Sequence, residues 1–169
     1  VDADEGHLPF RAITVALSAI ESGVVFFDDP IQRDSEIDAL IEVALERWLQ
    51  QGDAPLCYQP KHRLQDRQLV GAEALLRMRD TEGRMIAPMR VISLLRRHGR
   101  LAELEWATLQ SAINFLQQCR RDGWQLKIAV NVSAESLRLP DFGLRLQELL
   151  QLHDVPGAML RLEIVEWTE

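Results

Sequence analysis

Strand-type and helix-type segments alternate along this chain from residue 56 onward, and this alternation most constrains the fold. Two strand-like runs, 56–64 and 70–79, flank a polar turn and predict an antiparallel hairpin. Helix-type segments then separate further strand-like runs at 125–132 and 159–165. Strands separated by helices favour parallel pairing within one sheet. We therefore predict an α/β fold in which the first strand alone runs against its neighbours.

Four segments have the apolar spacing of amphipathic helices. The first is expected to begin at Ser35, because Ser35-Glu36-Ile37-Asp38 resembles a capping box, and to end before Gly52. Pro88 suits the first position of a short helix, and a longer helix is predicted from about Ala102 to Arg120. The fourth segment runs from Leu144 to Leu152.

Composition bounds the class of protein. The 169 residues are 47% apolar and 27% charged, as in an ordinary soluble domain with a real core. The net charge of −7 argues against DNA or RNA as a partner. Cys57 and Cys119 lack metal-site spacing, which favours a reduced cytoplasmic setting, and no apolar run reaches membrane-spanning length. The chain begins without Met, so we expect a piece of a longer protein.

The run from Val70 to Arg77 combines charged and apolar residues in an unusual way. Read as a strand, it places Glu73, Leu75 and Arg77 on one face. A charge that faces a core must be paired or must hold a metal or an anion. Taken alone, the pattern is more typical of a half-exposed strand with an ordinary surface pair.

Three polar residues lie near or beyond the middle of three strands: Glu73, Asn131 and Glu163. Carboxylate and amide oxygens suit Mg²⁺, Mn²⁺ or Ca²⁺, and in a (β/α) barrel the C-terminal ends of the strands form one site. Two simpler interpretations stay open. Asn131 and Ser133 could belong to a cap of the next helix, and Glu163 and Glu166 could be acids that face solvent.

Five short motifs follow one another along the chain. They are Tyr58-Gln59-Pro60, Gly71 with Glu73-Ala74-Leu75-Leu76-Arg77, Gly83 with Ile86-Ala87-Pro88, Ala129-Val130-Asn131-Val132-Ser133 and Leu162-Glu163-Ile164-Val165-Glu166. Through them, residues 35–169 resemble the N-terminal part of an EAL domain, the cyclic-di-GMP phosphodiesterase family of bacterial signalling. The resemblance implies a TIM-like (β/α) barrel with an antiparallel first strand, incomplete in this chain.

The resemblance also implies an activity and a set of site residues. EAL domains use Mg²⁺ or Mn²⁺ to hydrolyse one phosphodiester bond of cyclic di-GMP, which gives linear pGpG. Glu73, Asn131 and Glu163 match metal ligands of the family. Arg77 matches the arginine that contacts a ligand phosphate, and Gln59 is expected near the ligand.

The chain also departs from the family. It stops just after the strand that carries Glu163, before the family's Asp-Asp-Phe-Gly segment, catalytic lysine and later glutamate. We therefore expect no phosphodiesterase activity from this fragment alone. Unpaired strand edges predict either self-association, for example as a homodimer, or a place within a longer ordered protein. The alternatives to an enzyme are a degenerate EAL domain that only binds cyclic di-GMP, and an interaction protein that has lost the ligand.

The N-terminal segment is harder to interpret. Val24-Val25-Phe26-Phe27 looks like a strand, and Ala16 to Phe27 faintly resembles the end of a GGDEF cyclase domain, although the cyclase signature itself is absent. We expect residues 1–34 to be a linker or the tail of a preceding domain, and residues 35–169 to be the EAL portion.

Overall fold

The computed structural model describes residues 30–165, with the side chains of residues 34–165. The expected strand at Val24–Phe27 and the resemblance at Ala16–Phe27 lie outside the described residues. By its internal contacts the chain divides into two compact units, Val1–Glu42 and Val43–Glu169, and the sheet belongs wholly to the second. Of the first unit, only the opening part of helix α2 (Pro30–Gln51) is described.

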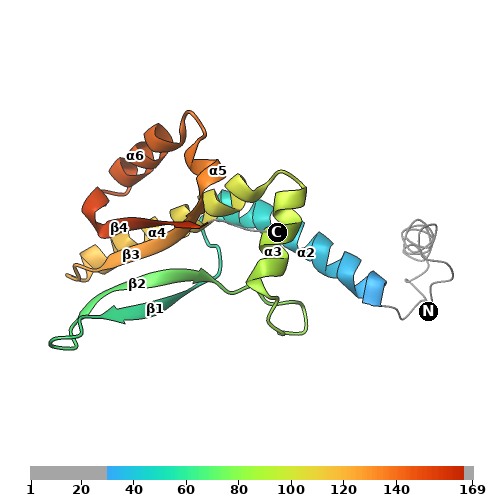
Figure 1. The fold of residues 1–169 in the computed structure, drawn as a ribbon, viewed down its shortest axis with the longest axis horizontal. Helices are drawn as coiled ribbons and strands as arrows, with labels where there is room; N and C mark the ends of the chain where they lie inside the picture. Colours follow the sequence, from blue (N-terminus) through green and yellow to red (C-terminus); the bar gives the residue numbers. More distant parts are fainter. Residues whose placement is uncertain (1–29, 166–169) are drawn as a thin grey trace, which may run out of the picture. The chain divides into compact units, whose positions relative to one another are not determined.

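The described residues contain one four-stranded sheet in the order β1-β2-β3-β4 (Figure 1). Its strands are β1 (Leu56–His62), β2 (Leu69–Leu76), β3 (Lys127–Ser133) and β4 (Leu160–Val165). Strand β1 is antiparallel to β2, whereas β2 with β3 and β3 with β4 are parallel. The predicted architecture is therefore confirmed, although β1 and β2 end earlier than residues 64 and 79.

Five further helical elements follow α2 within residues 30–165. They are α3 (Pro88–Arg97), α4 (Leu101–Arg121), α5 (Ala134–Leu137), α6 (Phe142–Leu152) and the 3-10 helix η1 (Gly157–Met159). Helix α3 begins at Pro88 as predicted, because a proline in the first turn removes no intrahelical hydrogen bond. Over the same residues, no helix is long and apolar enough to pass through a lipid bilayer.

Helix α2 corrects one prediction. It begins at Pro30, so the segment from Ser35 to Asp38 lies inside the helix and does not open it. Proline has its φ angle preset for a first helical turn, which lets the helix start earlier than the capping-box pattern indicated. The predicted end is confirmed, since Gly52 follows the last helical residue with a φ of +65°.

One face of the sheet carries the apolar core. Helix α4 contributes Leu109, Ile113 and Leu116 to this core, and all three are fully buried. Alternating sheet residues meet them: Ala72, Ala74, Ile128, Val130 and Val132. Side chains of a strand alternate between faces, so the intervening positions of the same strands lie on the opposite face. That opposite face carries the polar residues.

Gly71 sets the spacing between β2 and β3. Its register partner is Lys127, and a Cβ atom at Gly71 would lie 2.2 Å from the Lys127 carbonyl oxygen. Only a residue without a side chain fits there. The glycine therefore lets β2 and β3 pair closely just before Glu73.

Candidate functional site

The polar face of the sheet brings together the three residues that the sequence singled out as metal ligands. The side-chain amide of Asn131 on β3 donates a hydrogen bond to Glu73 Oε1 on β2, with an N–O distance of 3.0 Å. Asn131 and Glu163 are direct register partners across β3 and β4. All three side chains are half-buried. The set therefore spans three adjacent strands on one face.

A fourth residue, Lys61 on β1, joins this set and was missed by sequence reasoning. Its ammonium nitrogen donates a hydrogen bond to Glu163 Oε1 at 2.6 Å and lies 3.6 Å from Glu73 Oε2. The hydrogen bond to Glu163 is the main reason why the pKa of Lys61 is raised above its ordinary value. The predicted hairpin could have identified Lys61, because the pairing of its strands places Lys61 opposite Gly71, two residues from Glu73.

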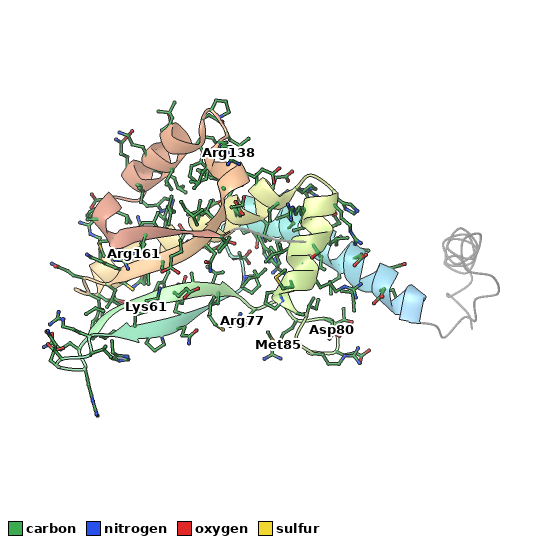
Figure 2. All side chains as sticks on the ribbon, viewed as in Figure 1. Lys61, Arg77, Asp80, Met85, Arg138 and Arg161 are labelled. Atoms are coloured by element: carbon green, nitrogen blue, oxygen red, sulfur yellow. The ribbon has the colours of Figure 1, made fainter. Side chains whose placement is uncertain are left out.

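Gln59 and Arg77 occupy different surroundings. Gln59 is the register partner of Glu73 and is exposed. Arg77 is the first residue after the end of β2, so the prediction that this strand runs to residue 79 was wrong, whereas a shared face with Glu73 stays a prediction. Figure 2 shows Arg77 beside the loop that carries Asp80 and Met85. The strand ends early because Asp80 forms a tight turn, in which its Oδ1 accepts hydrogen bonds from the backbone N–H groups of Glu82 and Arg84.

We call Glu73, Asn131, Glu163 and Lys61 the polar set. Arg77 nevertheless lies close to it. With Asn131 it lines a cavity of about 160 Å³ between β2, α3 and α4. Its guanidinium donates a hydrogen bond to the carbonyl oxygen of the preceding residue, Leu76, at 2.8 Å. The remaining guanidinium donors can therefore serve an anion that enters from this end of the sheet.

Glu105 on α4 is a second functional candidate that the sequence reasoning missed. It is 6% exposed, and its carboxylate accepts hydrogen bonds from the backbone N–H and the hydroxyl of Ser133, at 2.8 and 3.2 Å. Burial raises the pKa of Glu105, whereas hydrogen bonds from Ser136 and Ser133 oppose the rise. In the sequence, the helical spacing of Glu105 relative to Leu109 and Leu116 places its carboxylate on the apolar face of the helix. A carboxylate at such a position is unusual and could have identified Glu105 as a candidate.

Ser133 links Glu105 to the polar set. It ends β3 two residues after Asn131, and its hydroxyl accepts a hydrogen bond from the backbone N–H of Ser136 at 3.1 Å. Ser133 is therefore the N-cap of α5, as one of the simpler interpretations proposed. The cap and the buried carboxylate together fix the end of β3, where Asn131 is presented.

The donor atoms of the polar set fit a hard divalent cation. Glu73 and Glu163 offer carboxylate oxygens, and Asn131 offers an amide oxygen. The Lys61 ammonium already lies between the two carboxylates as a stand-in cation. Among the described residues there is no cluster of three or more His, Cys, Asp or Glu side chains with metal-binding geometry, so the amide would have to complete this set.

Comparison with known families decides what kind of domain this is. A sequence model of the EAL domain matches residues 42–168. The chain belongs to the EAL domain family. The match includes the strands that carry Glu73, Asn131 and Glu163.

Individual proteins and solved structures are similar to most of this chain. An uncharacterized protein of Mycobacterium tuberculosis is 30% identical over 140 residues, which are 82% of this chain and 44% of that protein. The probable cyclic di-GMP phosphodiesterase PdeI of Escherichia coli is 28% identical over 163 residues, which are 91% of this chain and 21% of PdeI. The crystal structure of the Xanthomonas citri FimX EAL domain in complex with c-diGMP matches with 29% identity and a TM-score of 0.60.

The FimX comparison also shows how much of an EAL domain is present. The match covers 74% of this chain and 51% of the FimX chain. The chain likewise spans less than half the length of the Mycobacterium tuberculosis relative. The four described strands therefore form part of a TIM-like barrel of EAL type, with the antiparallel first strand expected from the sequence.

Proposed function

We propose that this chain is the N-terminal part of an EAL domain that hydrolyses cyclic di-GMP to linear pGpG with Mg²⁺ or Mn²⁺. The observation that carries the proposal is the meeting of Glu73, Asn131 and Glu163 on three adjacent strands. The name of PdeI supports the reaction, and the FimX complex supports the ligand.

Each residue of the set has a distinct role in this proposal. Glu73, Asn131 and Glu163 hold the metal through oxygen atoms. When bound, the metal neutralises phosphate charge and lowers the pKa of the attacking water. Arg77 binds a phosphate oxygen through charge-assisted hydrogen bonds, and Gln59 contacts the ligand beside Glu73.

We further propose how this portion relates to the whole protein. Because it covers about half of the FimX EAL domain, residues 1–169 alone are expected to lack phosphodiesterase activity. Residues 1–34 serve as a linker or the tail of a preceding domain. The protein works in the cytoplasm, where Cys57 and Cys119, both free in the structure, stay reduced.

One observation favours a second candidate function. Lys61 places a positive charge between Glu73 and Glu163, where the enzyme needs its metal. A domain whose carboxylates are paired with a lysine could bind cyclic di-GMP without cleaving it. This second function is a receptor that keeps the EAL fold.

A single pair of measurements on the longest natural protein that contains this chain tests both functions. Calorimetric titration measures cyclic-di-GMP binding, and chromatography with Mn²⁺ measures release of pGpG. Release that is lost in Glu73→Ala but kept in Glu148→Ala, at an exposed position of α6, supports the enzyme. Binding without release supports the receptor, and the absence of binding contradicts both.

A further inference from the structure

Lys61 is the one charged residue of β1 that reaches the proposed metal ligands among the described ion pairs. Its ammonium nitrogen lies 2.6 Å from Glu163 Oε1 and 3.6 Å from Glu73 Oε2. The Lys61 side chain is 37% exposed, and those of Glu73 and Glu163 are 25% and 33% exposed. The three charges therefore form a compact, partly shielded group.

The contact between Lys61 and Glu163 depends on the curvature of the sheet. Their strands, β1 and β4, are the outer strands of the described sheet, with β2 and β3 between them. In a flat sheet three strand spacings amount to roughly 14 Å. A hydrogen bond across that span requires both side chains to point into a concave face. Figure 2 labels Lys61 on β1 and Arg161 on β4, and Arg161 shares a strand face with Glu163, two residues further along β4.

The charge balance of Lys61, Glu73 and Glu163 indicates how the Lys61 contact affects metal binding. Glu73 and Glu163 together carry two negative charges, which one divalent cation would balance without help. With Lys61 also in place, the group would carry an excess positive charge at short range, which is unfavourable. We propose that Lys61 is a built-in competitor of the metal, so that a divalent cation binds Glu73 and Glu163 only when the Lys61 ammonium moves away. This inference rests on the proposed metal site.

The surroundings determine how easily Lys61 can leave. A cavity of about 390 Å³ lies beside it, at the end of the sheet where β2, β3 and β4 begin. This cavity gives the side chain room to move, but Arg63, Lys127 and Arg161 also line it. These three further cations make the cavity an unfavourable place for a displaced ammonium. Lys61 therefore returns to the carboxylates unless the metal concentration is high, and metal affinity is held low.

The test is a Mn²⁺ titration of the longest natural protein that contains this chain, followed by calorimetry and by electron paramagnetic resonance of free Mn²⁺. Lys61→Met removes the competing charge, and Lys61→Arg keeps a cation. Lys127→Met is the matched control, because it removes a lysine that lines the same cavity but belongs to β3. Glu73→Gln identifies the fraction of Mn²⁺ that binds at the proposed site.

We expect Lys61→Met to tighten Glu73-dependent Mn²⁺ binding by on the order of tenfold, while Lys61→Arg stays near wild type. Lys127→Met should change the affinity much less. In thermal denaturation, which needs no activity, Mn²⁺ should raise the melting temperature of Lys61→Met more than that of wild type. A purely structural role of Lys61 would not produce that difference.

Other outcomes overturn the inference. If Mn²⁺ binds wild type and Lys61→Met equally, and Glu73→Gln abolishes binding in both, the metal site stands and the competition does not. If Lys61→Met and Lys127→Met raise the Mn²⁺ affinity equally, the effect comes from the change in net charge alone. That result would also contradict the competition. If no Glu73-dependent binding is found in any variant, the proposed metal site and the competition are both wrong.

Discussion

The Asn131 amide donates a hydrogen bond to Glu73 Oε1 although the two residues are 58 positions apart. They lie on adjacent parallel strands, β3 and β2, and point to the same face. The amide thus orients a carboxylate that we propose as a metal ligand. This relationship makes a direct prediction.

Asn131→Asp should make stability depend on metal. The substitution places a second carboxylate about 3 Å from Glu73 Oε1, where two negative charges repel each other. We expect a lower melting temperature than wild type in EDTA and partial recovery in Mn²⁺. Asn131→Ala, which removes the hydrogen bond without adding charge, should recover less. Equal recovery of both variants would contradict a metal role for this position.

Arg77→Ala should weaken cyclic-di-GMP binding by the longest natural protein. A charge-assisted phosphate contact contributes about 1.5–3 kcal/mol, so the affinity should fall by about ten- to a hundredfold. Arg79→Ala is the matched control, since Arg79 is exposed in the next loop and donates to the Gly83 carbonyl oxygen. Calorimetric titration measures both variants. Equal affinities for wild type and Arg77→Ala would mean that Arg77 is structural.

The ionisation of Glu105 should lower the free energy of unfolding as pH rises. Burial raises its folded-state pKa above the ordinary value of 4.5, so the folded state binds more protons than the unfolded state above that pH. The free energy of unfolding then decreases as pH rises from about 4.5 to the folded pKa. Glu105→Gln lacks this titration but keeps an oxygen acceptor for Ser133.

Urea unfolding at several pH values measures this effect. The stability of wild type relative to Glu105→Gln should decrease as pH rises above 4.5. Glu148→Gln, at an exposed position of α6, controls for the change in net charge. A difference that is constant with pH would show that the Glu105 pKa is not raised.

Gly71→Ala should destabilise the sheet. The new Cβ atom would lie 2.2 Å from the Lys127 carbonyl oxygen, which forces β2 and β3 apart. We expect a loss on the order of 3 kcal/mol in the free energy of unfolding. Gly143→Ala in α6 is the control, because its Cβ atom meets nothing within 4 Å and should be neutral or stabilising. Equal stabilities would contradict the close approach of the strands.

Purified residues 1–169 should release no pGpG from cyclic di-GMP with Mg²⁺ or Mn²⁺. Two-metal hydrolysis needs ligands for both ions, and the described set offers two carboxylates and one amide. Size-exclusion chromatography should also show self-association, because β4 is an outer strand whose Ile164 is 63% exposed. Steady release of pGpG that is lost in Glu73→Ala would show that a second chain completes the site.

The sequence by itself determined much of the architecture. Local alternation indicated the four strands and their directions, and the proline at position 88 fixed the start of α3. It also singled out Glu73, Asn131 and Glu163, because polar residues within apolar strands stand out against the period of two. These signals are local, so they need no knowledge of packing.

Only the tertiary structure decided which charges meet. Lys61 reaches Glu163 across 102 positions of the chain because the sheet curves, and no local pattern encodes that curvature. Glu105 meets Ser133 only because α4 packs against the end of β3. Strand β2 ends at Leu76, directly before Arg77, and Asp80 forms the turn that follows. Register, curvature and helix packing are collective properties, and they turned separate polar residues into one candidate site.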